Sequence, residues 1–223
     1  PDDVHRQPDP AGLLRDACTC QELGVHAMGV SLAETVQNGL GCRRVAPPRL
    51  DPAEQLAALS VHLTGTWGVK VGLCALEPEA LQRLAQTLAD LAPPVRIWDP
   101  ILAPSLGAPF HDVQELLEMA GILLPMGGWV VAPNLLEAAK ASGLPPGADP
   151  EALAGPFLAR GARAVWLKGG HLARPFVEDH WIDAAAARAV GRWPRLGGER
   201  RGTGCAVAAA ARSTHVVPSD GYA

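Results

Sequence analysis

The sequence predicts an α/β protein of three layers, in which helices cover both faces of a mainly parallel central sheet. Apolar segments with strand character alternate along the chain with helical segments of about ten or more residues, and this alternation is typical of parallel sheets with helical crossovers. The chain has 223 residues, 48% of them hydrophobic, which is enough apolar material for one sizeable core. No internal repeat or linker interrupts the pattern, so we expect a single domain over residues 1–223.

The N-terminal elements are predicted from a helix end and from an alternation of apolar side chains. Residues 12–24, GLLRDACTCQELG, predict a helix that ends at its final glycine. In residues 27–36, Met28, Val30 and Leu32 alternate with other residues, which favours a buried strand.

The remaining elements follow in regular alternation. Asp51 as cap, Pro52 at the first helical position and Glu54 three residues after the cap predict a helix start. Residues 170–198 are less regular, and we expect short antiparallel strands there. The other predicted strands are 69–74, 95–100, 129–134 and 163–170, and the predicted helices are 51–63, 77–92, 111–124, 135–143 and 149–161.

Charge and cysteine content exclude several classes of partner. The formal net charge is −4 with mixed signs, so we expect neither a nucleic-acid partner nor a membrane surface, and small molecules are the expected ligands.

The start of the chain lacks the pattern of a signal peptide, and no run of about 18 uncharged apolar residues occurs, which predicts a cytoplasmic protein. Five cysteines, an odd number, indicate free thiols, and we interpret Cys18 and Cys20 in the same way rather than as zinc ligands.

Polar and glycine residues follow each predicted strand. Ligands of open parallel sheets bind beyond the carboxyl ends of the strands, so these residues are expected at one rim. Ordinary loop chemistry explains any one of them alone. They are Glu34, Gln37 and Asn38 after the first strand, then Gly72 (followed by the apolar Leu73), Asp99, Asn134, Glu137, Lys168, Gly169 and Gly170.

Lys168 stands out because 16 of the 19 basic residues are Arg. Its ammonium beside two glycines is suited to a phosphate contact. Asn134 and Glu137 lie three residues apart at a helix start and therefore on one face. A carboxylate there suits water-mediated Mg²⁺ binding, and ordinary helix capping is the alternative interpretation.

Residues 199–213, ERRGTGCAVAAAARS, place a glycine turn directly before an alanine-rich helix. Gly202, Thr203 and Gly204 would present backbone N–H groups at the positive end of that helix, which favours an anion site. Cys205 falls in the first helical turn, where the pKa of a thiol is lowered. It is a candidate base for a substrate hydroxyl, and a small buried apolar residue is the alternative.

With these motifs in order, the chain resembles the hydroxymethylpyrimidine and phosphomethylpyrimidine kinases of thiamine biosynthesis, in the ribokinase-like superfamily. The resemblance runs from about residue 11 to residue 212. It is carried by AGLLRDA, AETVQNGLG, VKVGLC, WDPILAPSLGAPF, VVAPNLLEA, LKGGHL and RGTGCAVAAA.

The resemblance implies a ribokinase-like fold and a role for each matching residue. Asp16 and Gln37 would hold the aminopyrimidine and its hydroxymethyl group, with Gly72, Leu73 and Ile101 around the ring. Glu137 would bind the metal, with Asn134 and Asp99 near it on the Mg-ATP side, and Lys168 would approach the nucleotide phosphates. Gly202, Thr203 and Gly204 would form the anion hole, with Cys205 as the base.

The implied activity is ATP-dependent phosphorylation of 4-amino-5-hydroxymethyl-2-methylpyrimidine and of its monophosphate, by a homodimer. A pyridoxal kinase, or a non-catalytic relative that binds the pyrimidine, is the alternative. Relative to the family, the start and the end of the chain look incomplete, since Asp9 and Pro10 stand where two glycines belong and no family helices follow Arg212. Ala132 replaces a threonine and Arg201 a histidine.

Overall fold

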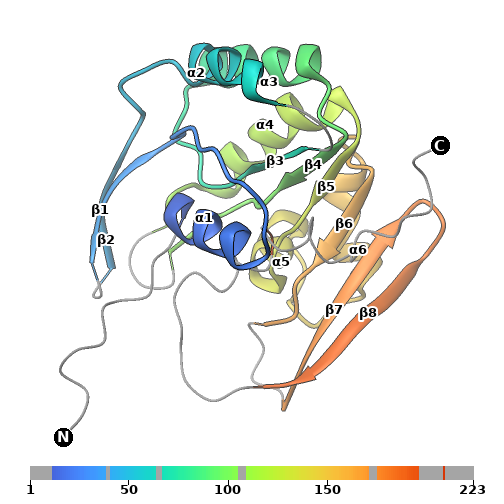
Figure 1. The fold of residues 1–223 in the computed structure, drawn as a ribbon. Helices are drawn as coiled ribbons and strands as arrows, with labels where there is room; N and C mark the ends of the chain where they lie inside the picture. The colour runs from blue at the N-terminus through green and yellow to red at the C-terminus, as the bar shows by residue number, and fades with distance from the viewer. Residues whose placement is uncertain are drawn as a thin grey trace, which may run out of the picture.

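The computed structural model describes residues 12–38, 41–63, 67–104, 109–170 and 175–195, together with Ala208. Within these residues, six strands form the central sheet in the order β3-β4-β5-β6-β7-β8 (Figure 1). They are β3 (Gly68–Val71), β4 (Val95–Trp98), β5 (Trp129–Val131), β6 (Ala164–Leu167), β7 (Phe176–Asp183) and β8 (Ala187–Pro194). The first four run parallel, and β7 and β8 are antiparallel additions. The predicted α/β class with a mainly parallel sheet is confirmed.

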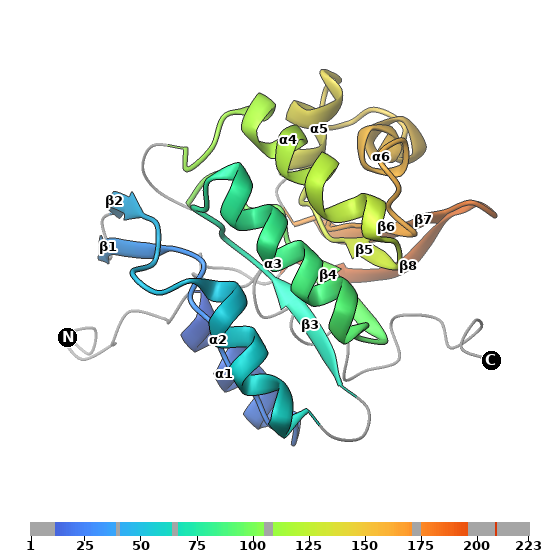
Figure 2. The same cartoon turned by 90° about the horizontal axis from the view of Figure 1, so that it is seen from above.

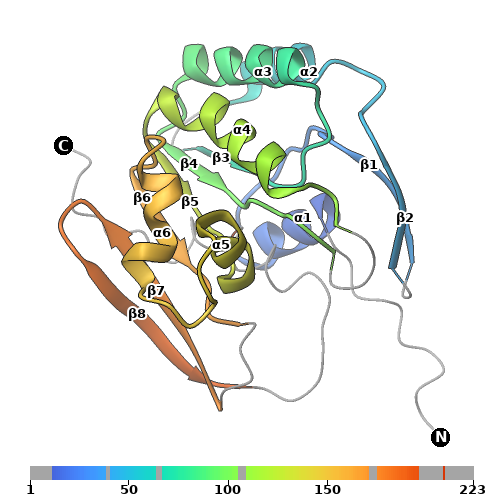
Figure 3. The same cartoon turned by 180° about the vertical axis from the view of Figure 1, so that it is seen from behind.

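Helices cover both faces of this sheet. They are α1 (Leu13–Glu22), α2 (Pro52–Leu59), α3 (Pro78–Leu91), α4 (Val113–Leu123), α5 (Leu135–Ser142) and α6 (Pro150–Leu158), with short 3₁₀ turns at Ser60–His62 and Leu124–Met126. Helices α3 to α6 form a row on one face, and α1 lies on the opposite face (Figures 2 and 3). Helix α2 packs beside α3.

Side-chain caps explain where several helices begin. The Asp51 carboxylate accepts the Ala53 N–H at 2.8 Å, so the predicted start of α2 is confirmed. In α4, the Asp112 carboxylate accepts the Glu115 N–H, and the Glu115 carboxylate accepts the Asp112 N–H. These reciprocal bonds satisfy N–H groups that have no partner inside the helix.

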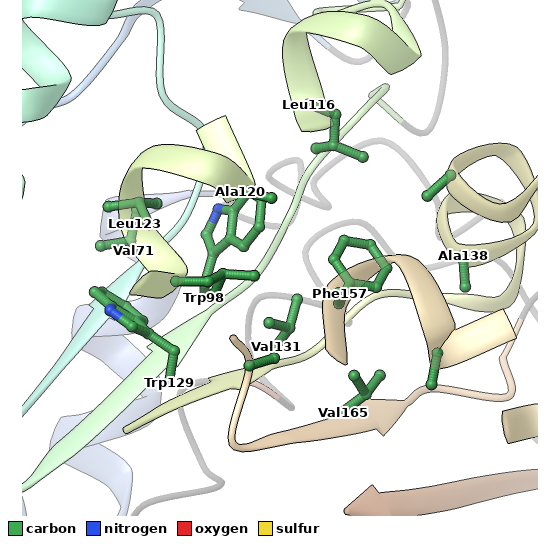
Figure 4. Close-up of a cluster of buried hydrophobic side chains, with 14 of the residues drawn as sticks. Val71, Trp98, Leu116, Ala120, Leu123, Trp129, Val131, Ala138, Phe157 and Val165 are labelled. Atoms are coloured by element: carbon green, nitrogen blue, oxygen red, sulfur yellow. The ribbon is translucent and has the colours of Figure 1, made fainter. Parts of the chain in front are cut away.

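The main core lies between the sheet and the row α3 to α6. Trp98 of β4 and Phe157 of α6 meet edge to face, with ring centroids 6.2 Å apart, while Trp129 and Leu116 are fully buried beside them (Figure 4). A smaller cluster on the other face contains Ile97, Val130, Ala132, Ala164, Trp166, Trp181 and Ala208. Successive strand residues such as Ile97 and Trp98 thus serve opposite faces, as expected for a strand buried on both sides.

The predicted buried strand at residues 27–36 is wrong. Residues 25–33 form no strand, and the first strands form a separate exposed hairpin of β1 (Glu34–Asn38) and β2 (Gly41–Ala46), seen beside the main body in Figure 1. The preceding segment instead lies against α1, because a Cβ on Gly29 would be 2.6 Å from the Leu13 side chain.

The hairpin is attached to the sheet at its base. The Leu32 carbonyl accepts the Ala75 N–H at 2.9 Å, in the loop that follows β3. Glu34, Gln37 and Asn38, expected beyond the end of a sheet strand, lie instead within β1 of the hairpin.

The C-terminal antiparallel strands are confirmed, although β7 and β8 have eight residues each and are not short. Among the described helices, none is long and apolar enough to cross a membrane.

Candidate active site

Apart from the three residues of the hairpin, the residues expected at the rim of the sheet follow the carboxyl ends of β3 to β6. The backbone ladder continues into these loops, since the Asp99 N–H donates to the Val71 carbonyl at 2.8 Å. Likewise, the Lys168 N–H donates to the Pro133 carbonyl at 2.9 Å, and the Lys168 carbonyl accepts the Leu135 N–H at 3.2 Å. Asp99 and Lys168 are thereby fixed on rigid backbone at one rim.

A row of alternating charges crosses this rim. Both oxygens of the Asp16 carboxylate lie 2.7 Å from the Lys70 ammonium, which is also 3.6 Å from Asp99 Oδ2. Asp99 Oδ1 in turn lies 2.7 Å from the Lys168 ammonium. Burial raises the pKa of Asp16, and the Lys70 ammonium opposes that shift. The row joins α1 to the ends of β3, β4 and β6.

Asn134 and Glu137 form a capping box at the start of α5. The Asn134 side-chain oxygen accepts the N–H groups of Leu136 and Glu137 at 2.9 Å, and the Glu137 carboxylate accepts the Asn134 N–H at 2.8 Å. The capping interpretation is therefore realised in the structure, and it leaves Glu137 beside the charged row.

Glu137 differs from an ordinary capping glutamate because it is buried. Burial is the largest cause that raises its pKa to about 7, with the Lys168 charge opposing and the Asp99 charge adding to the shift. The second oxygen of Asp99, Oδ2, is buried and has no hydrogen-bond partner among the described residues. The rim thus holds a readily protonated carboxyl, and an Asp99 oxygen that lies near the Lys70 ammonium without a hydrogen bond among the described residues.

One cavity of about 270 Å³ lies between α1, the hairpin and the ends of β3 and β4. Its lining includes all five residues expected to bind substrate, which are Asp16, Gln37, Gly72, Leu73 and Ile101. They come from α1, from β1 and from the loops after β3 and β4. The structure thus brings together residues that are 85 positions apart in the sequence, from Asp16 to Ile101.

A larger and more apolar cavity of about 1020 Å³ lies next to it, between α1 and the sheet. Asp16 and Lys70 line both cavities. Gly202, Thr203, Gly204 and Cys205 lie outside the described residues.

Lys70 is the residue of this site that the sequence analysis did not single out. It lies inside β3, where a polar side chain reads as ordinary strand alternation. The available signal was its type, because the chain contains only three lysines, at positions 70, 140 and 168. Two of these three lie in the charged row.

Comparison with known proteins gives a consistent result. A family model described as "Phosphomethylpyrimidine kinase" matches residues 10–216. The hydroxymethylpyrimidine/phosphomethylpyrimidine kinase of Streptomyces coelicolor is 30% identical over 210 residues, which cover 90% of this chain and 74% of that protein.

Two solved structures have the same fold. The phosphomethylpyrimidine kinase of Clostridium difficile superposes with a TM-score of 0.71 at 22% identity, covering 96% of this chain and 86% of that one. The pyridoxal kinase of Staphylococcus aureus, solved with AMP-PCP and pyridoxal, gives 0.74 at 25% identity, covering 92% and 75%. The expected ribokinase-like fold is confirmed.

Proposed function

Because this chain belongs to the phosphomethylpyrimidine kinase family, we propose that it uses ATP to phosphorylate 4-amino-5-hydroxymethyl-2-methylpyrimidine and then its monophosphate, in thiamine biosynthesis. One observation carries the proposal for the substrate. The five residues expected to bind the pyrimidine line a single cavity, and that cavity shares Asp16 and Lys70 with the charged rim.

In this proposal the polar groups of the cavity orient the ring. The Asp16 carboxylate accepts a hydrogen bond from the amino group, and the Gln37 amide offers a donor and an acceptor side by side. Leu73 and Ile101 pack against the faces of the ring. The Lys70 ammonium favours the charged form of Asp16, in which both carboxylate oxygens are acceptors.

The phosphate end of the proposed site is the rim beside this cavity. Lys168 contacts the phosphates of ATP, with Asn134 and Asp99 nearby. The residues present fit Mg²⁺, since Asp99 Oδ2 is a buried oxygen without a hydrogen-bond partner among the described residues and Mg²⁺ prefers oxygen ligands and retains water. Asp99 and Glu137 would hold the ion through water, and the ion would neutralise charge on the transferred phosphoryl group.

The described side chains include no cluster of three or more metal-ligating residues. This donor set suits an ion bound mainly by phosphates and water, which is usual for Mg²⁺ in phosphoryl transfer.

In the proposed transfer, Cys205 accepts the proton of the substrate hydroxyl. The hydroxymethyl oxygen then forms a bond to the γ-phosphorus, and the bond to the bridging oxygen breaks with its electron pair leaving on ADP. Gly202, Thr203 and Gly204 donate backbone N–H groups to the transferred phosphoryl oxygens. In the second step, a phosphate oxygen of the monophosphate is the nucleophile.

The direct test is incubation of the full-length protein with Mg-ATP and the hydroxymethylpyrimidine, followed by separation of the products. We expect the monophosphate first and the diphosphate later. Absence of both products would refute the proposed reaction, and pyrimidine binding without turnover would favour the non-catalytic alternative.

A pyridoxal kinase is the second candidate, favoured by the similarity to the Staphylococcus aureus enzyme. Competition between pyridoxal and the pyrimidine for one pool of enzyme distinguishes the two. We expect kcat/KM to be higher for the pyrimidine, and a preference for pyridoxal would replace our assignment.

The assignment of Cys205 has its own test. We expect Cys205→Ala to lower kcat by about 10²-fold or more, because a positioned general base contributes that much. Cys74→Ala is the control, since Cys74 is a buried thiol of the core. An unchanged kcat in the first variant would remove Cys205 from the mechanism.

A further inference from the structure

Asp179 of β7 is a buried carboxylate directly behind the glycine loop after β6. The residue is only 5% exposed. Oδ1 accepts the backbone N–H of Gly169 at 2.9 Å, and Oδ2 accepts the indole N–H of Trp166 at 3.1 Å. Both oxygens are therefore engaged by the segment that carries Lys168.

The register of β7 against β8 changes beside this residue. Asp179 pairs with Gly191 and His180 with Ala189, so a bulge leaves Val190 of β8 as the extra residue. Bulges redirect side chains and occur often near active sites. Immediately before the bulge, the Glu178 backbone lies so close to Gly169 that a Cβ there would overlap its carbonyl. Strand β7 therefore packs directly against the loop, and only glycine fits at position 169.

The opposite side of the loop is held by the chain that leads into α5. The Lys168 N–H donates to Pro133 and its carbonyl accepts from Leu135, which forms a parallel bridge between Asn134 and Lys168. The Lys168 side chain then reaches Asp99. Hydrogen bonds thus hold residues 168 and 169 from both sides, through the start of α5 and through Asp179.

Burying a carboxylate at this position costs desolvation free energy unless its oxygens are hydrogen-bonded. Burial raises the pKa of Asp179, while the Gly169 N–H, the Trp166 indole, and the charges of Lys168 and His180 act in the opposite direction. A buried polar group of this kind gives geometric precision when every acceptor is satisfied.

We propose that Asp179 is a positioning residue for the nucleotide phosphates, which holds the Gly169 N–H and thereby sets the position of Lys168. It does not touch substrate and acts through the backbone of the loop. The inference rests on the proposed function only for the assignment of Lys168 to ATP.

The test compares three variants of the full chain. Asp179→Asn keeps the shape of the side chain and loses one of its two acceptor oxygens. Trp166→Phe keeps the carboxylate but removes the indole N–H that holds Oδ2, so the carboxylate is less firmly oriented toward the Gly169 N–H. Asp183→Asn is the matched control, because Asp183 also lies on β7 and accepts an indole N–H, from Trp181 at 2.7 Å, but serves the β7–β8 turn.

The first readout is Mg-ATP affinity measured by calorimetry without pyrimidine. We expect about tenfold weaker binding for Asp179→Asn, since a hydrogen bond to a charged group typically has that worth. A smaller loss is expected for Trp166→Phe, and none for Asp183→Asn. The second readout is steady-state kinetics, in which the KM for ATP rises and the KM for pyrimidine does not.

Two results would overturn the inference. One is equal Mg-ATP affinity in Asp179→Asn and the wild type, or, if that variant fails to fold, no loss at all in Trp166→Phe. The other is an equal rise of both KM values, which a merely structural role would give. A wild-type chain that binds Mg-ATP but does not phosphorylate the pyrimidine would refute the proposed function, and the affinities would still decide the role of Asp179.

Discussion

Lys70 is the residue on which the two halves of the proposed site depend. Its ammonium touches Asp16 in the pyrimidine cavity and lies 3.6 Å from Asp99 at the phosphate end. We expect Lys70→Met to raise the KM for pyrimidine about tenfold, because Asp16 loses a charge-assisted partner and is more readily protonated.

Lys140→Met is the control for this substitution. Lys140 is exposed on α5 and is the one lysine outside the charged row. Steady-state kinetics of both variants between pH 5 and 8 provide the comparison. Identical KM values for the two variants would show that Lys70 does not support Asp16.

The raised pKa of Glu137 predicts how the free energy of unfolding depends on pH. Its pKa is raised from 4.5 to about 7 in the folded protein, so between these values the folded state binds more protons than the unfolded state. The free energy of unfolding therefore falls as pH rises through this window, by on the order of 3 kcal/mol for a shift of this size. Glu137→Gln removes the titration, and its stability should become less dependent on pH.

Denaturant unfolding at pH 5 and pH 8 tests the sign. The wild type should lose stability relative to Glu137→Gln as pH rises. Glu115→Gln removes the corresponding capping carboxylate of α4, which is exposed, and controls for the lost cap bond. A wild type that gains stability relative to Glu137→Gln would contradict the assignment.

The predictability of single residues depended on their surroundings. Asp99 and Lys168 follow apolar strands, so their place at the rim could be inferred from the alternation alone. The role of Lys70 could not be inferred, because its position within a strand does not show that α1 brings Asp16 next to it. Asp179 was missed for a similar reason, since its role arises from contact with Gly169 across the β6–β7 pairing.

At the scale of elements, the two capping boxes offer a direct comparison. Those of α4 and α5 have the same geometry, with Asp112 and Asn134 as the caps. We expect Asp112→Ala and Asn134→Ala each to cost about 1 kcal/mol of stability. Only Asn134→Ala should also raise the KM for ATP, because only α5 starts beside Lys168.

Denaturant unfolding and kinetics on the same preparations separate the two effects. A KM for ATP that rises equally in both variants would mean that the change comes from lost stability, and Asn134 would then be a cap alone.

The hairpin shows where element prediction failed. Residues 27–33 alternate as a strand does, yet the chain there contacts α1 and the loop after β3. An alternating pattern shows which side chains are apolar. It does not show whether those side chains pack within a sheet or against the surface of a helix. The strands β1 and β2 were not separated because their mostly exposed side chains leave no apolar face in the sequence.

At the scale of the molecule, the parallel part of the sheet and its helices could be predicted from the sequence. Short continuous apolar runs identify the strands and a period of 3.6 residues identifies the helices, while short connections place sequential strands side by side. That distant segments form one cavity could not be inferred, because the apolar pattern indicates which residues are buried but not which elements contact each other. The grouping of these cavity residues was predicted from the resemblance to the family and could not be predicted from the individual segments.

The core that joins sheet and helices yields a prediction of stability. Phe157 of α6 is fully buried against Trp98 of β4, so Phe157→Ala should cost about 3–5 kcal/mol. Phe176 is 42% exposed on β7, with Arg192 over its ring, and Phe176→Ala should cost about 1 kcal/mol or less. Equal losses in denaturant unfolding would mean that the α6 contact is not part of the cooperative core.

The hairpin that carries Gln37 forms a sheet of its own, and the chain leading into it bonds to the loop after β3, where the Leu32 carbonyl accepts the Ala75 N–H. Its mostly exposed strands add little to the core, so substitutions there carry a small penalty for folding. In the proposed site, Gln37 can therefore change, and with it the choice of substrate, without loss of the core or of the charged row.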